Sequence, residues 1–480
     1  MRGRHRIWTL ILGSLVATGA AANEVSLTPC PDQFGVTARC GWAEVAENRA
    51  APEGRRIRVR VVVLPSAAAA SAEPLVMFPG GPGQATPTLI PLATQAYPRV
   101  LEKRDVVLIG QRGSGESNAM HCLTDLASDP ERVFGALWPR EAIRECHERV
   151  LEHADPSEYT TADYVADVAE VLDALGYGKV VLWGGSGGTR TAQAFVREHP
   201  ERVVAAVLDG VTPIDYRMPL PFSGYAQRAW RRVVADCEAQ PGCAAAYPEL
   251  EADLKRVFDR VEAGPVPTTI ARADGAAATV EVRAGDLAYA LRGVLYGART
   301  IPRLPAEVHH AAATGDLSYF AQALYDRASA LLGGVVAVGL HLSSYCAEDV
   351  PRLAGVDVAA ETAETFLGGY LVAEYRGACD NWPVTPAAPD WYRDFSSPIP
   401  TLLVSGYYDP STPAEAAEAV RRSFPNSRHV VVRDQSHGAG FTCLRPVVEE
   451  FLLSASLTDV ADPCSGEPLV FAVDEPSAQE

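Results

Sequence analysis

The 480-residue sequence lacks a long apolar run, an excess of basic residues and any internal repeat. Its N-terminal apolar run, 7–17, is shorter than the roughly 20 residues that a membrane-spanning helix needs. With 60 acidic against 42 basic residues the net charge is −18, which argues against binding to nucleic acid or to an anionic membrane. Glycine and proline number 39 and 36 beside 48% hydrophobic residues, so collagen-like and intrinsically disordered chains are excluded. What remains is a folded chain that is long enough to bury a sizeable core.

The first residues follow the order of a secretory signal peptide. Arg2, Arg4 and Arg6 precede the apolar run 7–17, and the alanines of 20–22 follow it. This stretch contains no Arg-Arg pair, so it indicates Sec-type and not twin-arginine export. We therefore expect residues 1–22 to be removed by cleavage near Ala22, and the mature protein to lie in a periplasm or outside the cell.

The ten cysteines include no Cys-x-x-Cys pair, a spacing typical of metal sites and redox motifs. In an exported protein an even number of cysteines favours disulfides. The sequence alone does not fix the connectivity, but pairing nearest neighbours closes five short loops. The predicted pairs are Cys30–Cys40, Cys122–Cys146, Cys237–Cys243, Cys346–Cys379 and Cys443–Cys464.

Short β-branched runs alternate with helical patterns in two parts of the chain. The first part contains runs typical of buried strands at 57–64, 75–78, 106–109, 180–183 and 203–208. Helical spacing of apolar residues dominates 212–398, and the alternation returns at 401–453. This order predicts an α/β fold, with a mostly parallel sheet, helices on both faces and an inserted helical cap. We expect a core of 23–211 and 399–480, a cap of 212–398, and a poorly ordered tail after Glu467.

A Gly-x-Ser-x-Gly motif, 184–188, lies between the strand 179–183 and a predicted helix at 189–199. In a nucleophile elbow the chain turns sharply from strand to helix, and glycines around the serine let its hydroxyl project above the sheet. Ser186 is therefore the candidate nucleophile. The same pattern also occurs in ordinary glycine-rich turns and in phosphate-binding helix starts.

A serine nucleophile needs a base and an acid, which in this fold follow it in the order Asp or Glu, then His. We choose His437, in a glycine-rich loop after a strand, over His429, which falls inside that strand. We choose Asp409, directly after the strand 401–405, as the acid. Asp209 and Asp434 are the alternatives.

Backbone N–H groups must stabilise the oxyanion that forms when a hydroxyl attacks a carbonyl. One of them should belong to Gly187, the residue after the candidate nucleophile. The other should come from the glycine-rich loop 79–84, which follows a strand, and Gly81 is our choice.

Further motifs accompany the Ser186 elbow and the Asp409 and His437 loops along nearly the whole mature chain. They are Pro79-Gly80-Gly81-Pro82-Gly83, Gln111-Arg112-Gly113-Ser114-Gly115-Glu116-Ser117, Tyr159-Thr160-Thr161 with Asp163 and Asp167, Val207-Leu208-Asp209-Gly210-Val211, Cys346-Ala347-Glu348-Asp349 and Cys379-Asp380-Asn381-Trp382-Pro383. With these motifs the sequence resembles the prolyl and tripeptidyl aminopeptidases, a family of α/β-hydrolases, including its members with a TAP-like C-terminal region. The resemblance implies the α/β-hydrolase fold.

Three residues depart from the family pattern. Pro79 stands where prolyl aminopeptidases usually have histidine, which favours the tripeptidyl type, and Gly110 replaces an aspartate that often precedes the Gln-Arg-Gly motif. Gly187 replaces an aromatic residue that often follows the nucleophile, so one wall of the substrate pocket should be missing.

The resemblance implies hydrolysis of short peptides from their free N-terminus through an acyl-enzyme, with no metal or organic cofactor. Such an enzyme needs a carboxylate in the cap for the substrate's α-ammonium, and we predict Glu348, with Asp349 and Asp380 as alternatives. A solvated acidic pair beside a disulfide is the competing interpretation of these residues. A carboxylesterase and a binding protein on an inactive hydrolase scaffold are the other functions considered. The oligomeric state does not follow from the sequence.

Overall fold

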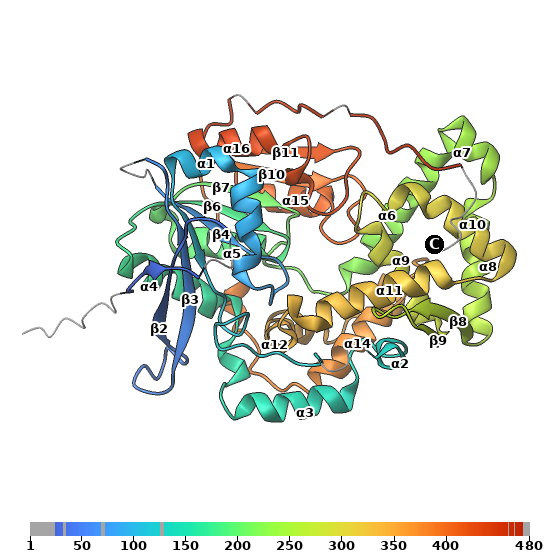
Figure 1. Ribbon diagram of the computed structural model, residues 1–480, viewed down its shortest axis with the longest axis horizontal. Coiled ribbons are helices and arrows are strands. Elements are labelled where there is room, and N and C mark those ends of the chain that lie inside the picture. The colour runs from blue at the N-terminus through green and yellow to red at the C-terminus, as the bar shows by residue number, and fades with distance from the viewer. Residues whose placement is uncertain are drawn as a thin grey trace, which may run out of the picture.

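The computed structural model describes residues 25–31, 35–68, 73–124, 129–458, 460–464 and 466–473. The predicted signal peptide and its cleavage site near Ala22 lie outside these residues. Figure 1 shows a sheet flanked by helices next to a largely helical cap.

A nine-stranded sheet, ordered β1-β2-β3-β5-β4-β6-β7-β10-β11, forms the centre of the core. Pairing is antiparallel from β1 to β5 and parallel from β5 to β11. The strands are β1 Thr28–Pro29, β2 Arg39–Ala46, β3 Arg56–Leu64, β4 Leu75–Phe78, β5 Val106–Ile109, β6 Val180–Gly185, β7 Val203–Asp209, β10 Thr401–Gly406 and β11 Ser427–Val432. β4 and β5 are buried along their whole length, as parallel strands covered on both faces must be.

Helices cover both faces of the sheet, as predicted. The side chains of a strand alternate between the faces, so Leu182 packs with one set of helices while Val181 and Trp183 pack with the other. The first set is α4 Thr161–Ala174, α5 Gly187–Glu198 and α15 Ala414–Arg421, and the second is α1 Pro98–Lys103 and α16 Arg445–Ser454. The chain therefore has the α/β-hydrolase arrangement, with the turn after β6 at the carboxyl end of the sheet.

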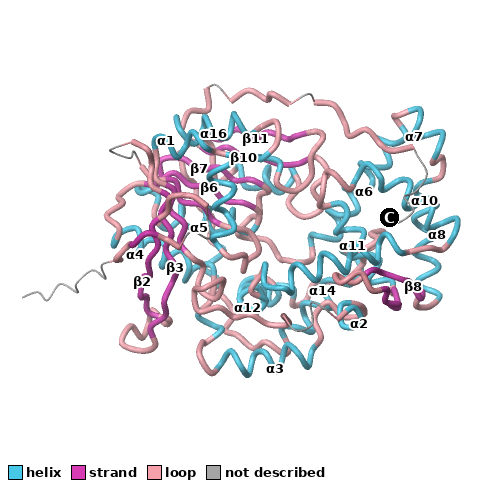
Figure 2. Tube along the Cα trace, viewed as in Figure 1, coloured by secondary structure: helices cyan, strands magenta, loops and turns pink. Residues whose placement is uncertain are grey.

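The cap is mostly helical, with a two-stranded hairpin that the sequence did not reveal (Figure 2). Its elements are α6 Pro221–Glu238, α7 Pro241–Ala246, α8 Leu250–Ala263, β8 Val266–Ala271, β9 Ala277–Val282, α9 Ala284–Leu295, α10 Leu304–Thr314, α11 Ser318–Ala330, α12 Val338–Glu348, α13 Val358–Glu361 and α14 Tyr370–Cys379. In α9 the buried apolar residues Leu287, Leu291 and Val294 recur at helical spacing. Within the described part of the chain no helix is long and apolar enough to cross a membrane.

Two helices within 23–211, the segment predicted to belong to the core, pack against the cap. The helices α2 Pro130–Val133 and α3 Arg140–Leu151 precede Ser186 in the chain, yet they lie beside α11, α12 and α14 (Figure 1). Val133 and Phe134 belong to the apolar cluster of the cap. The cap therefore includes α2 and α3 in addition to the helices of 212–398.

All five predicted disulfides are present. The bonds join Cys30 to Cys40, Cys122 to Cys146, Cys237 to Cys243, Cys346 to Cys379 and Cys443 to Cys464. All ten cysteines of the sequence are therefore paired. Five disulfides are typical of proteins that mature in an oxidising compartment outside the cytoplasm.

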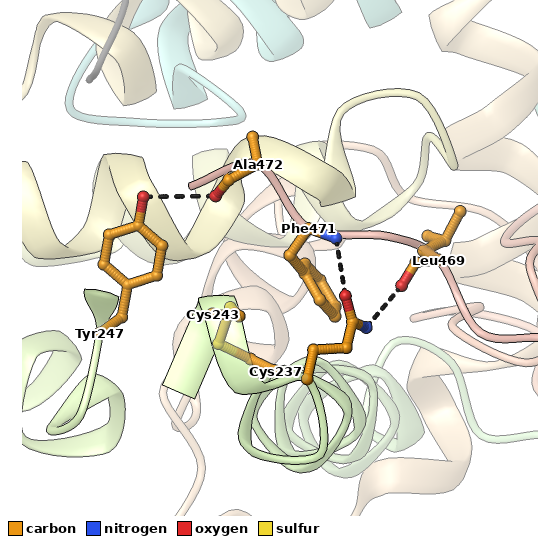
Figure 3. Close-up of a disulfide and its surroundings, with 7 residues drawn as sticks. Cys237, Cys243, Tyr247, Leu469, Phe471 and Ala472 are labelled. Carbon is orange, nitrogen blue, oxygen red and sulfur yellow. Dashed lines mark hydrogen bonds between the residues drawn. A yellow bond between two sulfur atoms is a disulfide. The ribbon is translucent and has the colours of Figure 1, made fainter. Parts of the chain in front are cut away.

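The segment 466–473 is not the loose tail expected from the sequence, because it returns to the cap (Figure 3). Gln240, which lies between Cys237 and Cys243, donates to Leu469 O at 2.8 Å and accepts from Phe471 N at 3.1 Å. Phe471 is only 4% exposed and joins the apolar cluster of the cap. The last described residues thus connect the core to the cap.

We expect Phe471→Ala to destabilise the protein by about 3–5 kcal/mol, because it empties a buried aromatic site. Chemical denaturation of the oxidised protein measures this loss. Val470 is the matched control, since it is 80% exposed beside Phe471. If Phe471→Ala unfolds at the same denaturant concentration as Val470→Ala, the segment does not stabilise the cap.

Candidate active site

Ser186 occupies a strained turn between β6 and α5. Its φ is +52°, a left-handed conformation that residues with side chains rarely adopt. The Ser186 N–H donates to Asp209 O at 2.8 Å, which ties the turn to the end of β7. The turn also packs tightly on β4, because a Cβ at Gly188 would lie 2.3 Å from Phe78 O. A glycine at 188 is therefore needed for the turn to pack against the end of β4.

The glycine-rich loop after β4 lies directly against Ser186 and the start of α5. A Cβ at Gly80 would lie 3.3 Å from Ser186 Cβ, and a Cβ at Gly187 would lie 2.8 Å from Gly81 O. The glycine at 187, a departure from the family pattern, thus leaves room for this loop. Among the hydrogen bonds of the described residues none uses the N–H of Gly81 or of Gly187. Two unpartnered N–H donors are therefore close to the serine, as expected for an oxyanion site.

His437 and Asp409 form a hydrogen-bonded pair. His437 Nδ1 lies 2.8 Å from Asp409 Oδ2, and Asp409 is almost completely buried. The other carboxylate oxygen of Asp409 accepts from the N–H groups of Ser411 at 2.8 Å and Thr412 at 2.9 Å. Thr412 Oγ1 also donates to Asp409 Oδ2 at 2.6 Å. These bonds fix the position of the Asp409 carboxylate. Because Nδ1 of His437 is bonded to Asp409, Nε2 is the ring nitrogen that can react with Ser186. No pattern in the sequence indicates this role of Thr412.

Burial and charge shift the pKa values of this pair. Burial is the largest single effect and disfavours the charged ring of His437, but the charges of Asp409, Tyr296 and Asp209 and the hydrogen bond to Asp409 together outweigh it and raise the pKa of His437 to about 9. Burial also disfavours the carboxylate of Asp409, yet the charge of His437 and the hydrogen bonds from His437 and Thr412 lower its pKa below the usual range. The two groups therefore form an ion pair near neutral pH.

The alternative acid and base residues have other surroundings. Asp209 Oδ2 accepts from Gly440 N at 3.1 Å, its Oδ1 is buried with no partner in the described structure, and burial raises its pKa to about 7. His429 lies 2.6 Å from Glu418 and 3.0 Å from Ser405 Oγ, on β11. No hydrogen bond of the described residues joins Asp434 to His437.

A cavity of about 320 Å³ between core and cap is lined by Ser186, His437, Gly81 and Gly187. Aromatic side chains form much of its wall, namely Trp138, Phe222, Tyr289, Tyr296, His341, Tyr345, Tyr370 and Tyr375. Arginines of the lining are Arg132, Arg292 and Arg327. Asp286 is the one acidic residue in the lining that the structure describes. The wall is thus apolar and aromatic, with more positive than negative charge.

The structure does not bring the predicted ammonium-binding carboxylates to this cavity. Glu348 accepts from the N–H of Thr161 at 2.6 Å, and Asp349 binds Arg190 through both oxygens at 2.7 and 2.9 Å. Both acids are buried, and burial raises the pKa of Glu348 to about 7. Asp380 is exposed at the end of α14. Glu348 and Asp349 thus hold α12 against α4 and α5, and none of the three predicted residues lines the cavity that contains Ser186.

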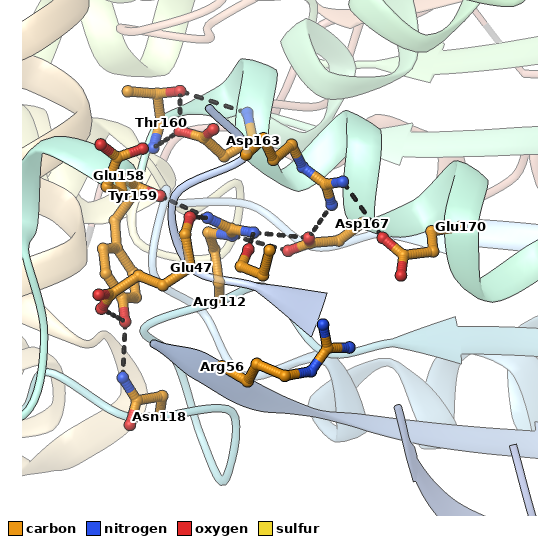
Figure 4. A network of polar contacts seen from close by, with 12 residues as sticks. Glu47, Arg56, Arg112, Asn118, Glu158, Tyr159, Thr160, Asp163, Asp167 and Glu170 are labelled. Carbon is orange, nitrogen blue, oxygen red and sulfur yellow. Dashed lines mark hydrogen bonds and ion pairs between the residues drawn. The ribbon is translucent and has the colours of Figure 1, made fainter. Parts of the chain in front are cut away.

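Arg112 of the Gln-Arg-Gly motif and the acids on α4 belong to a network of polar contacts (Figure 4). Arg112 is fully buried, and its five N–H donors bind Asp167 twice and the carbonyls of Ala46, Glu47 and Glu158. Gln111 Oε1 accepts from Gly83 N at 3.3 Å, which links this network to the glycine-rich loop beside Ser186. These family motifs thus support the site without lining its cavity.

Two family matches agree with this geometry. Residues 73–257 match the family described as alpha/beta hydrolase fold, and residues 365–464 match the family described as TAP-like protein. The chain is an α/β-hydrolase with a TAP-like C-terminal region. Together the matches include the Ser186 elbow and the Asp409 and His437 loops.

The chain is similar to two named peptidases, and the two matched segments differ greatly in length. This α/β-hydrolase is 25% identical over 464 residues to the serine protease Hip1 of Mycobacterium tuberculosis, covering 87% of this chain and 86% of that protein. It is 41% identical to the proline iminopeptidase of Neisseria meningitidis serogroup A, over 63 residues that are 13% of this chain and 20% of the relative. A solved esterase from Thermogutta terrifontis is 15% identical with a TM-score of 0.40, covering 86% of this chain and 98% of the esterase.

Proposed function

We propose that this hydrolase is a serine peptidase of the aminopeptidase type, which releases single residues or short peptides from free N-termini. The observation that carries the proposal is the His437–Asp409 pair on the same cavity as the strained Ser186. The name of the relative that matches most of the chain, a serine protease, favours amide over ester substrates.

The proposed reaction is acyl transfer. Ser186 Oγ attacks the scissile carbonyl while His437 Nε2 takes its proton, and Asp409 holds the ring through Nδ1. The N–H groups of Gly81 and Gly187 stabilise the oxyanion. His437 then protonates the leaving amine, and water releases the acyl group from Ser186 by the same route. The step uses no group beyond these residues and water.

Asp286 takes the place of Glu348 as the candidate ligand of the substrate's α-ammonium. It lines the cavity at the start of α9, and its oxygens accept from the N–H groups of Gly135 and Arg283, both at 2.9 Å. Each carboxylate oxygen can accept a further hydrogen bond. The cavity then accommodates the residues on the acyl side of the scissile bond.

A panel of fluorogenic mono-, di- and tripeptidyl amides, each with a free and an acetylated N-terminus, tests this function beside short-chain esters. We expect acetylation to lower kcat/KM by about 30- to 1000-fold, the loss typical of an unpaired buried charge. Asp286→Asn should lower the rate on free amines and change the rate on acetylated amides much less. Equal cleavage of free and acetylated amides would replace the aminopeptidase by an endopeptidase, and cleavage of esters alone by a carboxylesterase.

A further inference from the structure

A buried arginine beside the Ser186 site has no carboxylate partner. Arg292 lies on α9 and is 5% exposed. In the described part of the chain its side chain makes one hydrogen bond, from Nη2 to Ser411 Oγ at 2.5 Å, and its Nε is buried without a partner. A guanidinium that is removed from water without a counter-charge is costly, so this arrangement calls for an anion.

The other buried arginines described in this chain each have a carboxylate. Arg104 pairs with Glu73, Arg112 with Asp167, and Arg190 with Asp349. Arg292 differs from them in one further respect, because it alone of the four lines the cavity that contains Ser186. Its missing partner can therefore come from a bound substrate.

Arg327 adds a second positive charge at the same place. Its guanidinium lies 4.4 Å from the ring centre of Tyr296, and its Nε is buried with no partner among the described residues. Arg292 lies over the same ring at 5.3 Å and over Phe222 at 4.3 Å. Burial raises the pKa of Tyr296, but the charges of His437, Arg292 and Arg327 outweigh it and lower this pKa to about 8. This end of the cavity is thus electropositive.

The two arginines are close to the reacting groups. The ring of Tyr296 lies 4.5 Å from the ring of His437, measured between centroids. Ser411, which accepts from Arg292, donates its backbone N–H to Asp409. An anion bound by Arg292 would therefore lie on the His437 side of the cavity.

We propose that Arg292, with Arg327 beside it, binds a carboxylate of the substrate next to the bond that Ser186 attacks. The proposal rests on the proposed function, because the role of Ser186 fixes where the scissile bond lies. The substrate class is short peptides with a carboxylate close to that bond. The carboxylate belongs either to an acidic side chain or to the free C-terminus of the leaving residue, and Arg forms paired hydrogen bonds with both.

Two matched substrate pairs test the proposal and distinguish the sources. The first compares glutamyl with glutaminyl fluorogenic amides, which differ in the side-chain charge. The second compares dipeptides with the corresponding dipeptide amides, which differ in the C-terminal charge. In at least one pair we expect the acid to be preferred by about 10- to 100-fold in kcat/KM, as for hydrogen bonds to a charged group. The pair that shows the preference identifies the source.

Arg292→Gln should bring this preference close to one, and Arg292→Lys should restore part of it. Arg231→Gln is the matched control, since Arg231 is an exposed arginine on α6 outside the cavity lining, and it should keep the wild-type ratio. Rates are expressed per active site, titrated with a fluorophosphonate, so that misfolded protein does not enter the comparison. If Arg292→Gln yields no titratable sites, Arg327→Gln decides, and we expect it to reduce the ratio severalfold.

The proposal is overturned if the wild type shows no preference in either pair, or if titrated Arg292→Gln keeps the full wild-type ratio. An unchanged ratio in Arg327→Gln, where that variant decides, also overturns it. These results differ from a failure of the proposed function, which would leave every peptide substrate uncleaved or would give equal cleavage of free and acetylated amides. Cleavage of the neutral substrates with a ratio of one refutes the carboxylate site alone.

Discussion

Ser186→Ala is expected to lower kcat by about 10⁴- to 10⁶-fold while leaving the fold intact. The reason is that removal of Oγ abolishes the acyl-enzyme route, whereas the positions of Gly81, Gly187 and the His437–Asp409 pair do not depend on the hydroxyl. Alanine lacks one small polar atom at the turn, so the strain at φ +52° remains and the thermal midpoint should change little. A kinetic assay on the peptidyl amide that the wild type cleaves fastest measures the loss.

Covalent labelling identifies the nucleophile independently of the substrate. A fluorophosphonate should modify Ser186 in the wild type, with the adduct located by mass spectrometry of the proteolysed protein, and should leave Ser186→Ala unmodified. Ser454→Ala, at the exposed end of α16, serves as a control that keeps both label and activity. An adduct on Ser411, which also lines the cavity, or wild-type turnover in Ser186→Ala would contradict the assignment.

The features that could be predicted from the sequence depend on local patterns. The turn at Ser186 requires glycines on both sides, and these are adjacent in the chain. The strands before Asp409 and His437 are short apolar runs, so the loops that follow them could be placed at the edge of the sheet. The disulfides close loops of neighbouring cysteines, for which distance along the chain is a good guide to distance in space.

The features that the sequence did not reveal depend on contacts between distant segments. Nothing local shows that Arg190 on α5 meets Asp349 after α12, so the sequence alone favours a substrate site at the acidic pair 348–349. Phe471 lies within a short apolar run, 469–473, and only its contact with α6 and α7 shows that it is buried while its neighbour Val470 is exposed. The sequence likewise does not indicate a binding role for Arg292, because that role depends on contacts between distant segments. The apolar spacing of α9 predicts a helix there, but the cavity beside it is formed by residues from both ends of the chain.

Asp409→Asn is expected to reduce kcat/KM by about 10⁴-fold at its optimum and to move the acidic limb of the pH profile downward. The loss follows because an amide in place of the carboxylate can donate to Nδ1 and so favours the wrong tautomer of His437. The shift follows from the charge of Asp409, which is the largest contribution that raises the pKa of His437 to about 9. A base must be unprotonated, so wild-type kcat/KM should rise with pH up to about 9, by roughly tenfold per unit below that value. Without the carboxylate the limb should approach the ordinary histidine value of about 6.5.

The comparison with Asp209→Asn decides which carboxylate serves His437. Burial raises the pKa of Asp209 to about 7. Its charge raises the pKa of His437 less than the charge of Asp409 does. Its carboxylate accepts a hydrogen bond from Gly440 N and not from the ring of His437. Its substitution should therefore cost far less activity and leave the acidic limb within a fraction of a unit of the wild type. The measurement is kcat/KM from pH 5 to 10.5, with circular dichroism at each pH to exclude unfolding. A larger loss in Asp209→Asn, or a limb that stays near pH 9 in Asp409→Asn, would assign the role to Asp209, because a charge that does not control the protonation of His437 cannot be its partner.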